Sequence, residues 1–212
     1  MVGFTRVVAT ASLLVAGFLG TSSRAAVILD SLTVRIYDNA GVLAGERARA
    51  IKRANDILAR AELAVDWRDC PAGGVRPRAA CATPPAPGEL AVRLVRSPKH
   101  DPNPRALGNA LIDSATGSGT LATVFVDRVM TMATLGKLDT WSMVGGVMAH
   151  EIGHLLLGSN THTETGLMRE IWSLKDLVRN RPDDWFFSRA QRDELRNWRL
   201  TLRNMSPPPP AG

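Results

Sequence analysis

The chain carries, at residues 147–162, the sequence VMAHEIGHLLLGSNTH. On a helix, His150 and His154 are separated by about 40° in azimuth and about 6 Å in rise, so their rings project from one face. Two imidazoles in this arrangement suit two adjacent corners of a tetrahedral Zn²⁺ site. Glu151 lies about 100° further round the helix, within reach of a water at that site. The stretch therefore predicts a metal-binding helix with a carboxylate beside the metal.

Most of the other positions on this helix are apolar, and the pattern predicts that it runs from about Asp139, as N-cap, to Leu157. Gly158 is suited to the left-handed residue that ends it. Three of the four histidines lie between residues 150 and 162. Burial of unpaired imidazoles on an apolar helix is costly, whereas a metal ion satisfies them. We therefore expect one zinc ion per chain.

The motif resembles the active site of zincin metallopeptidases, most closely the metzincins, whose pattern is HExxHxxGxxH with a downstream Met-turn. Here the glycine comes one residue later than in that pattern and the third histidine two later. The resemblance assigns a role to each matching position: His150, His154 and His162 as zinc ligands, Glu151 as general base, Gly158 as the turn and Met168 as the Met-turn residue. Glu164 and Glu170 remain alternative third ligands, as in the His₂Glu gluzincins.

The function implied is that of a secreted zinc-dependent metalloendopeptidase acting on protein or peptide substrates. In it, Glu151 would take a proton from the zinc-bound water and pass it to the leaving amine. Two alternatives remain open: a secreted zinc-binding protein without catalysis, and a zinc amidase acting on a non-peptide amide. An extended substrate is expected to pair with the strand at residues 121–126 or with an edge near Leu111. Arg169 either meets a substrate carboxylate or lies on the surface.

Hydrophobic periodicity predicts the remaining elements. A strand, an amphipathic helix and a second strand begin the chain, and this order predicts a parallel strand pair with the helix packed on it. A Ser-x-x-Gln capping box at Ser188 opens the last helix. The fold class is α+β with an α/β-like start: a zincin-like mixed sheet, an active-site helix and a C-terminal helix. The expected ranges are strands at 32–37, 63–67, 89–96, 107–113 and 121–126, helices at 44–62 and 139–157, and loops at 70–88, 97–105 and 115–120.

Length and composition indicate one globular domain. The chain has 212 residues, of which 45% are hydrophobic and 22% charged, which excludes wholesale disorder. The formal net charge is +6, but the basic residues are scattered rather than interleaved with aromatic residues, so no nucleic-acid partner is expected. The metallopeptidase domain is predicted at residues 26–205, and residues 206–212 form a proline-rich tail that is predicted to be disordered.

Two features in the first half of the chain bear on where the protein is located in or outside the cell. Residues 1–25 have a basic start, a short apolar stretch and small residues near Ala25, which predicts a signal peptide; a retained N-terminal anchor is the alternative. Cys70 and Cys81 flank a loop containing glycine and proline and are predicted to form a disulfide, the alternative being two free thiols. We therefore expect a secreted or periplasmic protein with no stable membrane insertion after signal cleavage.

Overall fold

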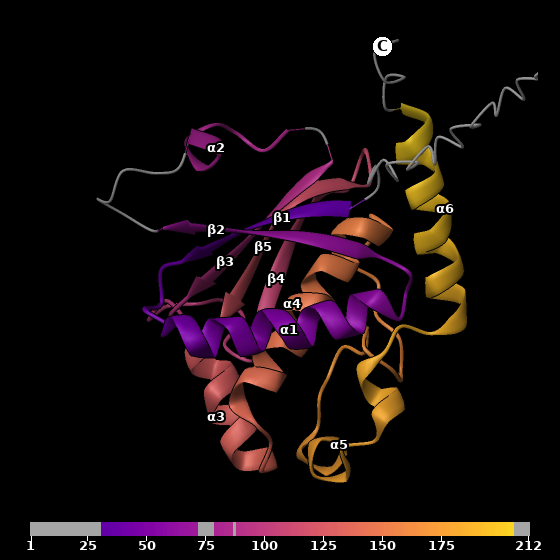
Figure 1. Cartoon of the computed structure of the whole chain (residues 1–212). Helices are drawn as coiled ribbons and strands as arrows, with labels where there is room; N and C mark the ends of the chain where they lie inside the picture. The colour runs from indigo at the N-terminus through magenta and orange to yellow at the C-terminus, as the bar shows by residue number, and fades with distance from the viewer. Residues whose placement is uncertain (1–30, 72–78, 87, 206–212) are drawn as a thin grey trace, which may run out of the picture.

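The computed structural model describes residues 31–71, 79–86 and 88–205. The predicted signal peptide (1–25) and proline-rich tail (206–212) lie outside the described residues, so both remain predictions. The described part contains a mixed sheet and helices arranged around it (Figure 1). The expected fold class is confirmed.

Five strands form one sheet in the order β2-β1-β3-β5-β4. Neighbouring strands are parallel except β4, which pairs antiparallel with β5 and forms one edge. The strands are β1 (Ser31–Asp38), β2 (Ala64–Pro71), β3 (Glu89–Val95), β4 (Gly108–Asp113) and β5 (Ser118–Phe125). The predicted strand ranges match these closely, although β2 runs on to Pro71 and β5 begins within the expected turn at 115–120.

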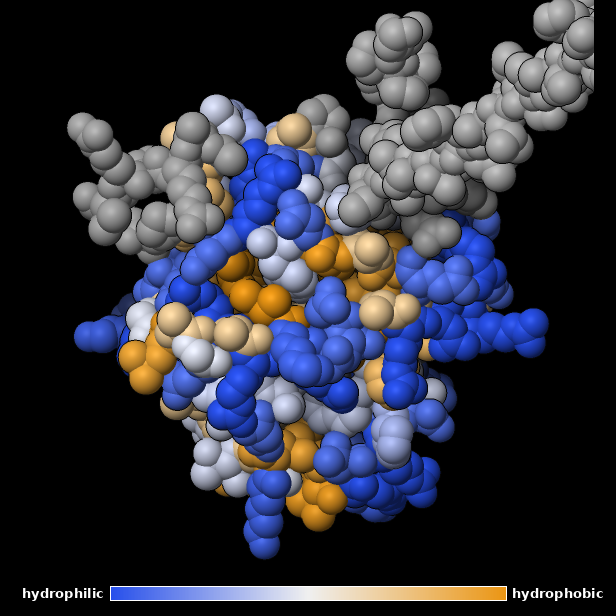
Figure 2. Space-filling model, in the orientation of Figure 1, coloured by the Kyte–Doolittle hydropathy of each residue, from blue (hydrophilic) through white to orange (hydrophobic). Residues whose placement is uncertain are grey.

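The β1–α1–β2 unit confirms the predicted parallel pair with its connecting helix. Helix α1 (Ala44–Ala59) buries Ala50, Ala54, Ile57 and Leu58 against the core. Half of its other positions are charged, and the face of the molecule seen in Figure 2 is mainly hydrophilic, with hydrophobic patches between. The helix ends before the predicted residue 62, because Glu62 adopts a left-handed conformation with φ 61°.

Helix α4 (Thr140–Leu157) is the central helix of the fold. It packs on β4 and β5 and also contacts α1 and α3 (Figure 1). Burial of all its residues from Met143 to Leu156 explains why its sequence is apolar nearly all round. Its predicted boundaries are confirmed within one residue.

Several short elements were not predicted from the sequence. Helix α3 (Val126–Gly136) follows β5 without an intervening loop, and its N-cap Phe125 makes no side-chain capping bond. The others are α2 (Ala79–Ala82), α5 (Leu174–Arg179) and the 3₁₀ helix η1 (Pro182–Trp185).

The last helix, α6 (Arg189–Met205), begins at the predicted capping box. The Ser188 amide donates to the Gln191 side chain, and the Gln191 amide donates back to Ser188 Oγ. Within the described ranges, no helix combines the length and the apolar character needed to cross a bilayer.

The predicted disulfide is present. Cys70, at the end of β2, and Cys81, in α2, are bonded, with Cα atoms 5.6 Å apart. The bridge fixes α2 to the β2 edge of the sheet, which is the edge opposite β4.

Candidate metal centre

Helix α4 positions the two histidines of the motif. Its N-terminus is capped by Asp139, whose side chain accepts a hydrogen bond of 2.8 Å from the Ser142 amide. At the other end, Gly158 takes a left-handed conformation with φ 60°, as predicted, and turns the chain out of the helix. His150 and His154 lie on the last three turns, where both side chains are buried.

The loop after the helix brings His162 back to the two helical histidines. The Nε2 atoms of His150 and His154 lie 3.0 Å apart, and those of His154 and His162 lie 3.2 Å apart. Among the described residues these three form the only cluster of His, Cys, Asp or Glu whose ligand atoms all lie within 4.8 Å of one another. Neither Glu164 nor Glu170 joins it, so the structure brings together the histidines and not the alternative ligands.

Backbone carbonyls fix the proton on two of the rings. His150 Nδ1 lies 2.7 Å from the Leu167 oxygen, and His154 Nδ1 lies 2.7 Å from the Ser159 oxygen. A carbonyl only accepts, so each Nδ1 must donate. Burial and the neighbouring His154 lower the pKa of His150 to about 3, and burial also lowers the pKa of His154. Both rings are therefore neutral, with a lone pair on Nε2.

This arrangement fits a divalent cation. Two Nε2 lone pairs that face each other at 3.0 Å repel unless something positive lies between them. Zinc holds histidine nitrogens at about 2.0–2.1 Å in a tetrahedron, which places neighbouring nitrogens about 3.3 Å apart. The Nδ1 atoms of His150 and His154 bond to backbone carbonyls, and metal-binding imidazoles are usually oriented in this way. The donor set of this chain thus matches one zinc ion.

Glu151 lies beside this cluster, between α4 and the edge strand β4. Its side chain is buried and makes no hydrogen bond to the described residues. A Cβ built on Gly108 would lie 2.6 Å from Glu151 Oε1, which shows how closely the carboxylate approaches the β4 backbone. Burial raises the pKa of Glu151 to about 8, whereas a cation nearby acts in the opposite direction. The carboxyl group is thus suited to exchange protons near neutral pH.

The segment after His162 packs against α4. The Thr163 amide donates to the Met168 oxygen at 2.8 Å, closing a turn, and Met168 is fully buried. Its sulfur lies only 2.7 Å from where a Cβ on Gly153 would be, so the methionine packs directly on α4. The resemblance made Met168 the Met-turn residue, and that role stays a prediction.

Arg169 does not lie on the surface, which was one of the two expectations for it. It is buried, and its guanidinium pairs with Asp184 and lies 3.5 Å from Asp176. Arg169 Nε also donates to the Gly166 oxygen at 3.1 Å. The ion pairs therefore hold the turn that supplies the Leu167 carbonyl. The expected surface position is wrong, and a contact with a substrate carboxylate stays a prediction.

The sheet decides between the two strands considered for pairing with a substrate. Strand β5 lies between β3 and β4, so the expectation for residues 121–126 is wrong because both of its edges are occupied. Strand β4 is the edge, and Leu111 on it is 70% exposed.

Four contributors were missed by sequence reasoning: the carbonyls of Ser159 and Leu167, the close approach of Gly108, and Trp172, whose ring lies 6.5 Å from that of His150. None has a local sequence signal, because each acts through a contact that only the folded chain creates.

The fold of this chain is similar to that of solved structures. Archaemetzincin from Methanopyrus kandleri matches with 18% identity and a TM-score of 0.50, over 81% of this chain and 96% of that one. A zinc-dependent peptidase from Methanocorpusculum labreanum matches with 17% identity and a TM-score of 0.52, over 76% of this chain and 99% of that one. No protein-family model and no curated protein matches the chain. The predicted likeness to the zincin fold is confirmed.

Proposed function

We propose that this chain is a zinc-dependent peptidase that hydrolyses peptide bonds with Glu151 as its proton-transfer group. The observation that carries the proposal is the convergence of three imidazole nitrogens, two of them 3.0 Å apart with lone pairs facing. The fold shared with archaemetzincin and with the zinc-dependent peptidase from Methanocorpusculum labreanum supports the same assignment.

His150, His154 and His162 would hold the metal. Zinc at these nitrogens supplies Lewis-acid chemistry, polarising a carbonyl and making a water acidic. The Leu167 and Ser159 carbonyls keep the rings of the two helical histidines oriented toward a common point.

Glu151 performs the proton transfers. Its buried carboxylate can accept a proton from the attacking water and later give it to the leaving amine. An extended peptide that pairs with the free edge of β4 would pass Gly108, against which this carboxylate lies. The edge strand would thus align the scissile bond with the proton-transfer group.

The test is Glu151→Gln, which keeps the shape of the side chain and removes its ability to accept the proton. Hydrolysis of a denatured protein is expected to fall by at least about 100-fold, since positioned general bases contribute roughly 10²–10⁴-fold. Bound zinc should remain. Glu164→Gln is the matched control, because Glu164 is exposed and outside the cluster.

Two results would contradict the proposal. Full turnover by Glu151→Gln would remove this residue from the mechanism. Zinc-loaded wild-type protein that cleaves no denatured protein in a chelator-sensitive way would favour a non-catalytic zinc protein or an amidase acting on other amides.

We also propose that the chain is exported to a secreted or periplasmic location. The Cys70–Cys81 bridge supports this location, because disulfides persist in oxidising compartments. Mass spectrometry of protein recovered from the medium or periplasm should find a mature N-terminus close to residue 26. Full-length protein confined to the cytoplasm would contradict it.

A further inference from the structure

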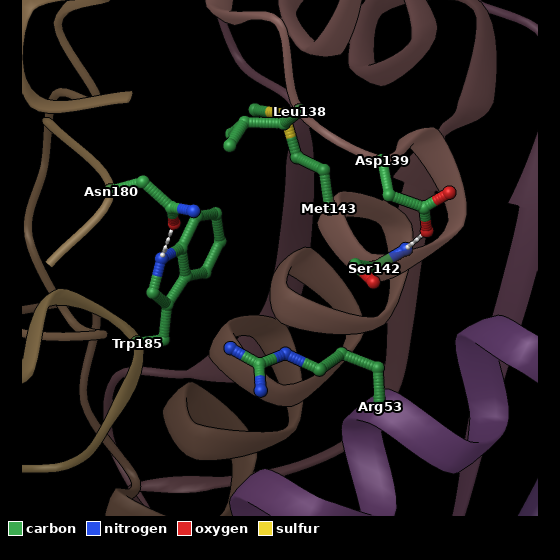
Figure 3. Close-up of a pocket in the computed structure, with 7 residues that line it drawn as sticks. All are labelled: Arg53, Leu138, Asp139, Ser142, Met143, Asn180 and Trp185. Carbon is green, nitrogen blue, oxygen red and sulfur yellow. Dashed lines mark hydrogen bonds between the residues drawn. The ribbon is translucent and has the colours of Figure 1, made fainter. Parts of the chain in front are cut away.

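A pocket lies at the N-terminal end of α4, away from the histidine cluster. It has a volume of about 280 Å³ and lies between α1, the start of α4 and the segment joining α5 to η1 (Figure 3). The wall contains both polar and apolar groups: Arg53, Leu138, Asp139, Ser142, Met143, Asn180 and Trp185. Met143 and His150 are seven residues apart on α4, about 10 Å along the helix axis, so the pocket is separate from the metal centre.

Arg53 is the charged group in this pocket that has no hydrogen-bond or ion-pair partner among the described residues. It is half-buried, and among the described residues no hydrogen bond or ion pair to its guanidinium is present. The group stacks instead near the rings of Trp185 and Phe186, with its central carbon 5.7 Å and 5.9 Å from their centres. In Figure 3 it reaches from α1 toward Trp185 at the side of the hollow. A guanidinium has five N–H donors, so a half-buried arginine usually has acceptors nearby.

The carboxylates of Asp139 and Asp56 are each paired with a cation other than Arg53. The carboxylate of Asp139 is already paired with Arg49 at 2.5 Å and accepts the Ser142 amide. On α1 itself, Asp56 is paired with Lys52 at 2.7 Å. Burial lowers the pKa of Arg53; Asp56 opposes this effect and the positive charge of Arg60 adds to it. A negative ligand would relieve both the burial and the repulsion.

The opposite wall offers a second donor and an apolar surface. Asn180 Oδ1 accepts a 2.8 Å hydrogen bond from Trp185 Nε1, as the dashed line in Figure 3 shows, which assigns the amide NH₂ to the free side. Leu138, Met143 and the Trp185 ring form the apolar part. The volume is slightly below the roughly 300–1,000 Å³ of ordinary small-molecule sites, so the ligand must be small.

We propose that this pocket binds a small organic monocarboxylate with a branched or aromatic apolar group. Its carboxylate bonds to the Arg53 guanidinium and the Asn180 amide, and its apolar group packs on Leu138, Met143 and Trp185. The proposal goes beyond the peptidase function and does not depend on it.

The probe is 4-methylpentanoate, titrated into the purified full-length protein. The Trp185 indole N–H resonance, assigned with Trp185→Phe, reports occupancy of this pocket and not of the metal centre. We expect it to shift in a saturable, one-to-one manner. The neutral 4-methylpentanamide has the same shape and should bind to the wild type at least tenfold more weakly, which is about 1.4 kcal/mol.

Arg53→Met keeps the aliphatic stem and removes the charge, and it should also weaken binding of the carboxylate at least tenfold. Arg60→Met is the matched control on the same helix, since Arg60 lies over Phe186 and not in the pocket. It should change the affinity far less than Arg53→Met does, because Arg60 acts on the pocket only through the repulsion of its charge. The proposal is overturned if the amide binds as well as the carboxylate, if Arg53→Met binds normally, or if no shift occurs up to about 10 mM, tenfold above a weak millimolar affinity.

Discussion

The position of the Glu151 carboxylate depends on residue 108 being a glycine, with no side chain. Gly108 opens β4, and a Cβ there would lie 2.6 Å from both Glu151 Oε1 and the Thr123 oxygen. The backbone oxygen belongs to the neighbouring strand and cannot move aside cheaply, so a Cβ would displace the β4 backbone at residue 108 as well as the carboxylate. A single methyl group at this position would therefore disturb the residue on which the proposed chemistry depends.

We accordingly predict that Gly108→Ala lowers kcat/KM for peptide hydrolysis by at least about tenfold, since misplacement by about 1 Å can cost as much as 100-fold. Zinc binding should be retained, because no metal-binding nitrogen is touched. Gly45→Ala is the control: a Cβ there meets nothing within 4 Å, and turnover should be unchanged. Wild-type kinetics in Gly108→Ala would mean that Glu151 has room to adjust or is not the proton-transfer group.

At the level of elements, the end of α4 and the β4–β5 turn fit against each other at two glycines. Gly158 has φ 60°, and a Cβ on it would lie 2.3 Å from the Gly117 oxygen. The helix end therefore needs glycine for two separate reasons, its left-handed conformation and the close approach of a second backbone. The loop that carries Ser159 and His162 begins at this glycine, so the contact also fixes where that loop starts.

Gly158→Ala should lower the free energy of unfolding by clearly more than Gly41→Ala. Gly41 has φ 77° but nothing within 4 Å of a built Cβ, so its substitution costs only the conformational term of about 1–2 kcal/mol. Urea unfolding of the two variants separates the contributions. Equal losses would show that the contact with Gly117 adds no stability.

Sequence patterns predicted the elements that have a long run of periodically spaced apolar residues or a polar capping residue. Helix α4 has Asp139 at its start and Gly158 at its end, and α6 has its Ser188 capping box, so both boundaries were predictable. Helix α3 was missed because it continues directly from the buried strand β5 without a loop, and because Phe125 offers no capping side chain. α2, α5 and η1 are too short to show a period.

For the whole molecule, the motif was sufficient to predict the fold class and the residues that meet at the centre. The sheet order was not predictable, because it depends on which strands pair rather than on any strand's own pattern; this is why β5 was considered as a substrate-binding edge. The buried pairing of Arg169 with Asp184 is similar, since a lone arginine in a sequence gives no sign of a distant carboxylate. Most of the features that could not be predicted from the sequence, such as the sheet order and this ion pair, depend on contacts between residues far apart in the chain.

The central claim is that His150, His154 and His162 together hold one zinc ion, although the helix and the loop contribute them separately. The most direct test is the zinc content and affinity of the purified chain, with His162→Ala beside the double variant Glu164→Ala/Glu170→Ala. We expect one zinc per wild-type chain and per double-variant chain. For His162→Ala we expect affinity at least about 100-fold weaker, beyond the 10–100-fold typical of losing an outer partner. A wild type that binds no zinc, or His162→Ala with undiminished affinity, would contradict the account.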